Sequence, residues 1–166
     1  MTAKGYPDYN TRFFLHKTSR ALQLPVFYVG DWDAFGIDIL LTYQFGSESC
    51  ALEARDLVVP HIQWLGPFLE DFSEKGRLAL SKRDKDKLED IRSREFFILK
   101  RWEKHIHEES RELIIRGVER VKEQVGKMAE SGAKYEVEAL ALIEPSHLTK
   151  HFLPSALSKA LSHFKE

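Results

Sequence analysis

The sequence has 166 residues and a formal net charge of −1, with 43% hydrophobic and 31% charged residues. Such a chain is long enough for one domain with its own core, and its near-zero charge gives no sign of a broadly basic surface. No apolar run approaches the ~20 residues that cross a bilayer, so we expect no membrane partner. The single cysteine, Cys50, excludes an internal disulfide and a metal site built from several cysteines.

The N-terminal segment predicts a loop followed by a helix. Residues 1–10 contain glycine, proline, aspartate and asparagine, which are typical of loops. Asp8 or Asn10 could cap a helix over residues 11–22. The apolar side expected for that helix has three residues, Phe13, Phe14 and Leu22. Pro25 then ends the helix.

Strand and helix patterns alternate in the next segment. Residues 26–29 are β-branched and aromatic and predict a short buried strand. Apolar spacing predicts a helix over residues 37–45, with Gly46 as its stop. Residues 56–66 predict a strand interrupted by Pro60 and then a second apolar stretch. The order helix, strand, helix, strand favours an α/β fold with a parallel sheet.

The second half of the sequence is more charged and predicts helices. Ser81, followed three residues later by Asp84, predicts the capped start of one helix. A longer helix is expected over about residues 103–130, where apolar residues recur every three or four positions. These residues are Ile114, Val118, Val121, Val125 and Met128. The stripe is too short for a sustained coiled coil and predicts a packing face. Residues 134–143 predict a further helical segment, so the C-terminal half should be helix-rich.

Two aspartates, Asp31 and Asp33, follow the first predicted strand. Ligands of parallel α/β sheets gather at the carboxyl ends of strands, and residues two apart on extended backbone point the same way. Neighbouring carboxylates repel unless a cation lies between them, and such oxygen ligands suit Mg²⁺ held against a phosphate. The alternative is that one aspartate caps the following helix and the other is solvated. Gly30 and Gly36 favour the ligand site, because glycine permits close approach of a ligand to the backbone.

Further segments extend the pattern around these aspartates over most of the chain. They are KGYPDYNTR at 4–12, VGDWDAFGIDILLTYQFGS at 29–47, VVPHIQWLG at 58–66, LSKRDKDKLEDI at 80–91, KYEVEAL at 134–140 and FLP at 152–154. In this order they resemble the toprim domain of the topoisomerase VI A subunit and of its eukaryotic relative, the meiotic protein that makes DNA double-strand breaks. An isolated Asp-x-Asp would be weak support, whereas several ordered motifs identify the family.

The resemblance implies a fold and a reaction. The fold is a toprim (Rossmann-like) parallel sheet flanked by helices, which residues 1–166 would form as a single domain lacking its first strand. Asp31 and Asp33 match the family's Mg²⁺ ligands. The reaction is that of type IIB topoisomerases, in which a tyrosine of a separate winged-helix domain attacks a DNA phosphodiester and forms a 5′-phosphotyrosyl link. We expect that domain and a third acidic ligand to lie upstream in a longer protein, so this chain alone should not cleave DNA.

The resemblance also implies partners and a location. The partners are double-stranded DNA and either a second copy of the chain or a B-type ATPase subunit. The wording of the motifs favours the meiotic branch, which implies the nucleus. Two other functions stay open: a non-catalytic fragment that mediates subunit contact, and a toprim domain of nuclease or primase type.

Basic residues of the matched segments are candidates for DNA contact. Lys4 and Arg12 flank the first motif and could bind a phosphate, the alternatives being a solvated lysine and a helix-surface arginine. Arg83 lies in another motif, although its pairing with the adjacent Asp84 could be purely structural. We interpret Lys134 as part of a pairing network on a helix surface.

Other residues received structural interpretations. His147 and His151 would share one face of a helix, and with no carboxylate expected nearby we interpret them as a solvated helix end. Trp32 is expected in the core or at its rim, with stacking on nucleic acid as the alternative.

Overall fold

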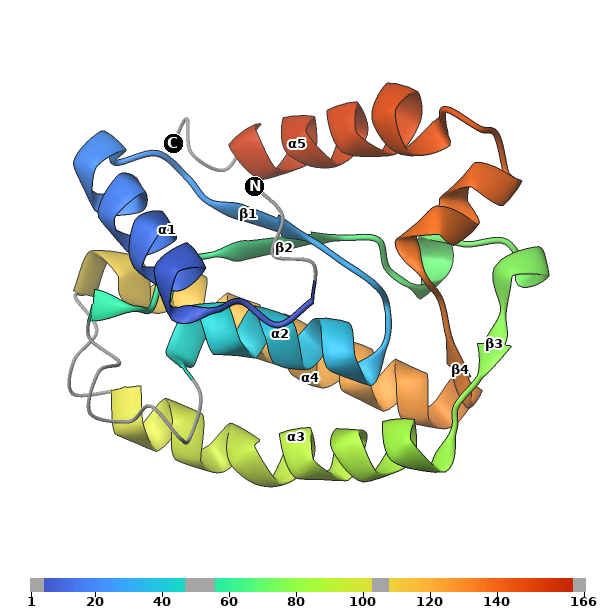
Figure 1. Ribbon diagram of the computed structural model, residues 1–166, viewed down its shortest axis with the longest axis horizontal. Helices are drawn as coiled ribbons and strands as arrows, with labels where there is room; N and C mark the ends of the chain where they lie inside the picture. The colour runs from blue at the N-terminus through green and yellow to red at the C-terminus, as the bar shows by residue number, and fades with distance from the viewer. Residues whose placement is uncertain (1–4, 47–55, 103–107, 163–166) are drawn as a thin grey trace.

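The computed structural model describes residues 5–46, 56–102 and 108–162 of the chain (Figure 1). Strands β1 (Phe27–Val29) and β2 (Gln63–Gly66) pair in parallel, with Tyr28 opposite Trp64. Helices α1 (Tyr9–Leu22) and α2 (Ala34–Phe45) precede and follow β1. The predicted order of helix, strand, helix, strand is therefore confirmed, as is the α/β class.

Helices dominate the C-terminal half, as expected. They are α3 (Lys82–Trp102), α4 (Glu108–Ser131) and α5 (Leu153–Ser162), with short helical turns η3 (Leu69–Asp71), η4 (Glu74–Gly76), η5 (Val137–Leu142) and η6 (Leu148–Phe152). In the view of Figure 1, α2, α3 and α4 lie below the two parallel strands and α5 lies above them. Among the described residues, no helix is both long and apolar enough to pass through a bilayer.

A short antiparallel ribbon, which the sequence does not predict, connects the start of α3 with the end of α4. Strand β3 (Leu78–Ala79) pairs with β4 (Ala133–Lys134). The helix predicted over residues 134–143 is wrong in its first part, because Lys134 belongs to β4 and a 3₁₀-helix begins only at Val137. The backbone of Tyr135 exchanges two hydrogen bonds with that of Trp32, and this pairing holds the chain extended.

The face of helix α1 that packs against the protein differs from the one predicted from the sequence. Asp8 caps it as expected, since its carboxylate accepts a hydrogen bond from the Thr11 N–H at 2.7 Å. However, the three residues of its predicted apolar side, Phe13, Phe14 and Leu22, are exposed. The residues of α1 that are fully buried are polar, namely Arg12, His16 and Ser19, and the half-buried Leu15 packs against the core. The Nδ1 atom of His16 lies 2.8 Å from the Val58 carbonyl oxygen, so this face meets backbone that needs polar partners.

The segment before β2 is buried without being a strand, which corrects the prediction over residues 56–66. Leu57, Val58 and Val59 are at most 4% exposed, but pairing begins only at Gln63. The Val59 N–H donates to the Tyr43 carbonyl, and the Ile62 N–H donates back to the Val59 carbonyl. These bonds fold the segment into a turn around Pro60, where a strand would need a continuous ladder.

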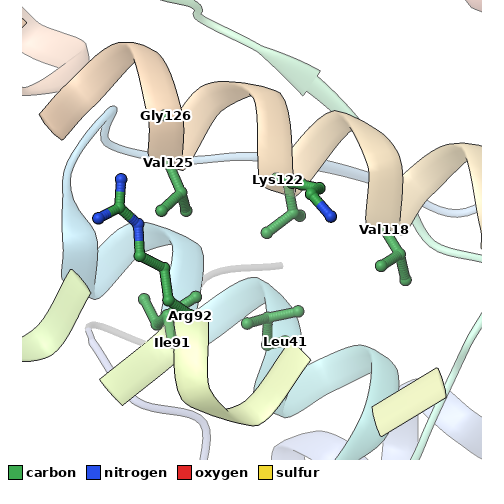
Figure 2. A pocket seen from close by; sticks show the side chains of 8 residues that line it. Leu41, Ile91, Arg92, Val118, Lys122, Val125 and Gly126 are labelled. Carbon is green, nitrogen blue, oxygen red and sulfur yellow. The ribbon is translucent and has the colours of Figure 1, made fainter. Parts of the chain in front are cut away.

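The hydrophobic core lies between the parallel strands and the helices below them. All five residues of the predicted stripe on α4 are buried, which confirms the packing face. Ser81 and Asp84 cap α3 reciprocally, as expected. Helices α2, α3 and α4 leave a mostly apolar hollow, whose volume is about 350 Å³. Figure 2 shows Leu41, Ile91 and Val125 among the side chains that line it. Arg92 and Lys122 also line this hollow.

Candidate metal centre at the carboxyl end of β1

Asp31 and Asp33 occupy the turn that joins β1 to α2. The residue between them, Trp32, is fully buried and donates a hydrogen bond from Nε1 to the Gln124 side-chain oxygen at 2.8 Å. Successive side chains on extended backbone point in opposite directions. The burial of Trp32 therefore turns both aspartates toward the other side, where each is half-buried. The expectation that Trp32 lies in the core is therefore confirmed.

One oxygen of each carboxylate is held by a backbone N–H. Asp31 Oδ1 accepts from Val137 at 2.8 Å, and Asp33 Oδ1 accepts from Gly36 at 2.6 Å as the N-cap of α2. The second oxygen of each carboxylate has no hydrogen-bond donor within the described parts of the chain. The helix cap and the ligand site are thus not exclusive, because the cap occupies one oxygen and leaves the other available.

Glycine in this turn permits contacts within the protein. A Cβ atom at Gly36 would lie 2.3 Å from the Asp31 carbonyl oxygen, and one at Gly30 would lie 2.2 Å from the Tyr28 hydroxyl. That hydroxyl crosses the turn and donates to the Gly36 carbonyl oxygen at 2.9 Å. Any larger residue at 30 or 36 would displace these groups, so both glycines fix the position of the aspartates.

The electrostatics of the turn disfavour the ionised form of Asp33. Burial raises the pKa of the Asp33 carboxyl, and the negative charge of Asp31 raises it further. The hydrogen bond from the Gly36 N–H offsets this rise only in part. A cation between the two carboxylates would relieve their repulsion and restore the ionised form.

A buried ion pair flanks the aspartates. Asp84 is fully buried, and the Lys134 ammonium lies 3.0 Å from its carboxylate. The charge of Lys134 lowers the pKa of Asp33, and that of Asp84 raises it, so both act on the candidate site. The interpretation of Lys134 as part of a helix-surface network is wrong, since it extends from β4 to a buried partner.

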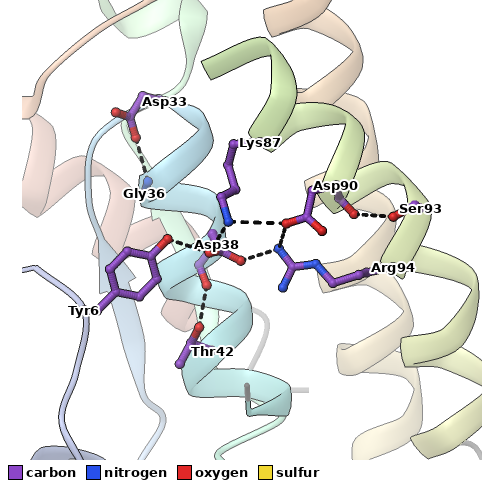
Figure 3. A network of polar contacts seen from close by, with 9 residues as sticks. All are labelled: Tyr6, Asp33, Gly36, Asp38, Thr42, Lys87, Asp90, Ser93 and Arg94. Atoms are coloured by element: carbon purple, nitrogen blue, oxygen red, sulfur yellow. Dashed lines mark hydrogen bonds and ion pairs between the residues drawn. The ribbon is translucent and has the colours of Figure 1, made fainter. Parts of the chain in front are cut away.

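A second carboxylate cluster lies further along α2 and was missed from the sequence. Asp38 is 4% exposed and accepts hydrogen bonds from Tyr6 at 2.5 Å, from Arg94 at 2.5 Å and from Lys87 at 3.3 Å (Figure 3). Burial alone would raise the pKa of Asp38, but these donors outweigh it and hold that pKa below its usual value. The only signal in the sequence was the presence of Tyr6 and Asp38 in matched motifs.

The predicted DNA-contact residues differ in how exposed they are. Arg83 is exposed, and its guanidinium lies 4.9 Å from the ring centre of Phe35, two residues beyond Asp33. Arg12 is only 4% exposed, so the expectation of a helix-surface arginine is wrong, and a phosphate has no direct access to its side chain. Lys4 lies outside the described residues. Of the two candidates that the structure describes, Arg83 is therefore the one that lies near Asp33 on the surface.

The histidine pair lies elsewhere and has a carboxylate neighbour. The rings of His147 and His151 are 5.5 Å apart, which confirms a shared face. The expectation of no nearby carboxylate is wrong, because Glu144 lies 3.2 Å from His151 Nε2. Among the described residues, no group of three or more His, Cys, Asp or Glu side chains is arranged to hold a metal ion.

The donor set at β1 fits a hard cation that needs few protein ligands. Mg²⁺ is commonly bound by one or two carboxylates and keeps its remaining positions for water and phosphate oxygen. Asp31 and Asp33 each offer a carboxylate oxygen without a donor among the described residues, and a cation would relieve their mutual repulsion. A third acidic ligand stays a prediction of the resemblance.

Comparisons with known proteins identify the family of the chain. Residues 1–157 match the family model for the Toprim domain of Spo11 and of the A subunit of topoisomerase 6. The chain is 35% identical to meiotic recombination protein SPO11-1 of Oryza sativa and 31% identical to SPO11 of Mus musculus, covering 39% and 36% of those proteins. It is 31% identical to the A subunit of DNA topoisomerase 6 from Arabidopsis thaliana, covering 34% of it. These alignments include 95–96% of this chain, which thus spans well under half the length of each relative.

Proposed function

Because the chain belongs to the family of Spo11 and the topoisomerase 6 A subunits, we propose that it is the Mg²⁺-binding toprim portion of a protein that cuts DNA during meiotic recombination. Residues 1–166 form one domain in this proposal, and the complete protein acts in the nucleus on double-stranded DNA. The observation that carries the proposal is the pair Asp31 and Asp33, each anchored by one oxygen, with the other oxygen unpartnered among the described residues.

The chemistry of the complete protein would divide between two domains. A tyrosine oxygen from outside this chain replaces the 3′ oxygen at a DNA phosphorus and gives a 5′-phosphotyrosyl ester. Bound Mg²⁺ supplies charge stabilisation at that phosphate. Asp31 and Asp33 hold the ion, while Arg83 at the same edge offers a charged donor to a neighbouring phosphate.

Metal titration of near-isosteric variants tests the site. Asn at 33 keeps an oxygen to accept from the Gly36 N–H, and Asn at 31 keeps one for Val137, so both anchors survive while the charge is removed. We expect Asp31→Asn with Asp33→Asn to weaken Mg²⁺ and Mn²⁺ binding at least about tenfold, measured by calorimetry and by Mn²⁺ electron paramagnetic resonance. The matched control is Asp86→Asn, an exposed aspartate on α3.

The outcomes separate the proposal from its alternatives. Equal metal affinity in the wild type and the double variant would overturn the metal centre and leave the subunit-contact function. A covalent adduct between DNA and the isolated chain would contradict the expectation that its nucleophile lies elsewhere. DNA cleavage by the isolated chain with Mg²⁺ and without an adduct would instead indicate a nuclease-type toprim domain.

Subunit contact has an observation of its own in its favour. The outer face of α1 exposes Phe13, Phe14 and Leu22, with Tyr9 stacked on Phe13 at 6.1 Å between ring centres. We propose that this face contributes to pairing with a second copy, as the resemblance implies for the family. Phe14→Glu should then shift the chain from dimer to monomer in light scattering, whereas an unchanged mass would remove α1 from the contact.

A further inference from the structure

A groove separate from Asp31 and Asp33 is lined by residues of α4, β2 and α5. Its volume is about 890 Å³, within the range of ligand-binding clefts. The floor is apolar and is formed by Leu40, Ile62, Trp64, Leu65, Phe68 and Phe152. Small residues line both helical walls: Gly117 on α4, and Ala156 and Ala160 on α5. Small side chains at these positions leave room for another polypeptide backbone to approach closely.

The rim of the groove is basic. Its cationic or titratable residues are Arg116, Arg120, His147, Lys150, His151 and Lys159. Arg116 is paired with Glu112 and His151 with Glu144, but Lys150 and Lys159 have no ion pair with any residue that the structure describes. Among the described lining residues only Asp71 is acidic, and its Oδ2 accepts a hydrogen bond from the Phe68 N–H at 2.8 Å.

Two buried polar atoms of residues that line the groove lack partners within the described parts of the chain. Gln44 is 1% exposed and donates from Nε2 to the Ile62 carbonyl oxygen at 2.9 Å, which leaves Oε1 as an acceptor without a donor there. Trp64 is 8% exposed, and its Nε1–H has no acceptor among the same residues. An unsatisfied buried polar group is unfavourable. The unpaired acceptor on α2 and the unpaired donor on β2 match what a peptide group offers, namely one N–H and one C=O.

We propose that this groove binds an acidic, amphipathic segment of a partner protein. Aliphatic side chains of the segment would lie on the apolar floor, between the small residues of α4 and α5. Its carboxylates would meet Lys150 and Lys159, whose charges are unpaired among the described residues. Polar groups of the segment would pair with Gln44 and Trp64 after small adjustments of these side chains.

The observations favour a protein segment over nucleic acid. The floor lies between two helices. Its aromatic residues Trp64 and Phe152 are each 8% exposed, which permits contact with an aliphatic side chain but leaves no open ring face on which a base could stack. A nucleic acid would be held by phosphate contacts along an open surface. Here the cations surround an apolar floor, which is typical of a groove that receives an amphipathic helix.

Binding of a defined probe tests the proposal. The probe is a fluorescein-labelled peptide of about 15 residues, long enough to form a helix, with leucine at i, i+3, i+4 and i+7 and glutamate elsewhere. We expect saturable binding to the full chain in fluorescence anisotropy, weakened by salt. Lys150→Glu with Lys159→Glu should weaken it at least about tenfold. The matched control, Arg20→Glu with Lys75→Glu, makes the same change of net charge at two exposed positions outside the groove.

A second variant addresses shape without changing charge. Ala156→Phe should fill the groove and weaken binding by a similar factor, with thermal unfolding used to verify that the variant folds. The proposal is overturned if the probe fails to saturate, or if the control pair weakens binding as much as the groove pair. Tighter binding of the labelled probe with lysine in place of glutamate, or of a labelled DNA duplex to the same residues, would also overturn it. Asp31→Asn should leave probe binding unchanged, which keeps this test independent of the metal centre.

Discussion

Asp33 and Asp38 lie five residues apart, at the cap and in the body of the same helix α2, and their surroundings differ sharply. Asp38 is saturated by Tyr6, Lys87 and Arg94, and its pKa is lowered despite burial. Asp33 has the Gly36 N–H as its donor, and its pKa is raised by burial and by the charge of Asp31. Both are carboxylates on one element, but of the two only Asp33 retains an oxygen without a partner among the described residues.

The difference separates stability from binding. Asp38 joins three segments of the chain, because its donors come from the N-terminal loop and from α3 (Figure 3). Its charge is already balanced, so a metal ion would have to compete with protein cations. The charge of Asp33 is not balanced locally, so a bound cation would stabilise its ionised carboxylate. Substitutions at the two positions should therefore affect different measurements.

The largest expected effect is the loss of stability in Asp38→Ala. The change leaves Arg94 and Lys87, which are 19% and 26% exposed, without their buried partner. Breaking such a pair by removing one member costs about 3 kcal/mol, measured by chemical denaturation, while Mg²⁺ affinity should be unchanged. Asp90→Ala is the control, because Asp90 pairs with the same two cations from an exposed position, and its loss should cost less than about 1 kcal/mol. Equal costs for the two variants would mean that the burial of Asp38 does not strengthen its ion pairs.

The next effect is the pH dependence of metal binding. Protons compete with the metal for Asp33, so affinity should fall by up to about tenfold for each pH unit below its raised pKa. Calorimetric titrations of Mn²⁺ at several pH values measure this slope. Asp33→Asn should remove the slope along with most of the affinity, whereas Asp86→Asn should retain both. A slope unaffected by Asp33→Asn would assign the titration to another group.

The two carboxylates should also change metal-free stability in opposite directions with pH. The raised pKa of Asp33 contributes stability that is present below the usual carboxyl pKa and is lost as pH rises through its folded value. The lowered pKa of Asp38 contributes stability that is present above the usual value and is lost as pH falls through its folded value. Bound metal should reverse the pH dependence of the stability that Asp33 contributes and leave that of Asp38 unchanged.

The sequence predicted what neighbouring residues determine. The Asp33–Gly36 cap, the Ser81–Asp84 cap and the α4 stripe all depend on contacts within a few positions, or on one helical period, whereas the anchor of Asp31 on Val137 spans 106 positions. The α1 face was misjudged because the helix packs on the Val58 carbonyl, a contact 42 residues away. The Asp38 cluster depends on Tyr6, Lys87 and Arg94, which lie 32, 49 and 56 positions away from Asp38 along the chain, so it gives no periodic signal in the sequence. The groove is likewise assembled from α2, β2, α4 and α5.

A smaller effect distinguishes the two roles of Asp33. Asp33→Ala removes both the charge and the cap of α2, and losing an N-cap costs about 1 kcal/mol. Asp33→Asn keeps the acceptor for the Gly36 N–H and should leave stability close to that of the wild type. Both variants should lose metal affinity to the same extent. If Asn restored metal binding together with stability, the carboxylate would serve the cap alone.

The smallest predicted effect lies at the edge of the Asp38 cluster. Tyr6 is 50% exposed, so Tyr6→Phe removes a hydrogen bond that is partly open to water and should cost about 0.5 kcal/mol. The sharper measurement is the carboxyl titration of Asp38 by NMR, because the Tyr6 hydroxyl is one of the donors that lower the pKa of Asp38, and that pKa should rise. Tyr9→Phe is the matched control, since Tyr9 is 51% exposed and its hydroxyl has no hydrogen bond to any described residue. An unchanged Asp38 pKa in Tyr6→Phe would mean that Arg94 and Lys87 alone hold this carboxylate ionised, and that the N-terminal loop is not coupled to α2 through it.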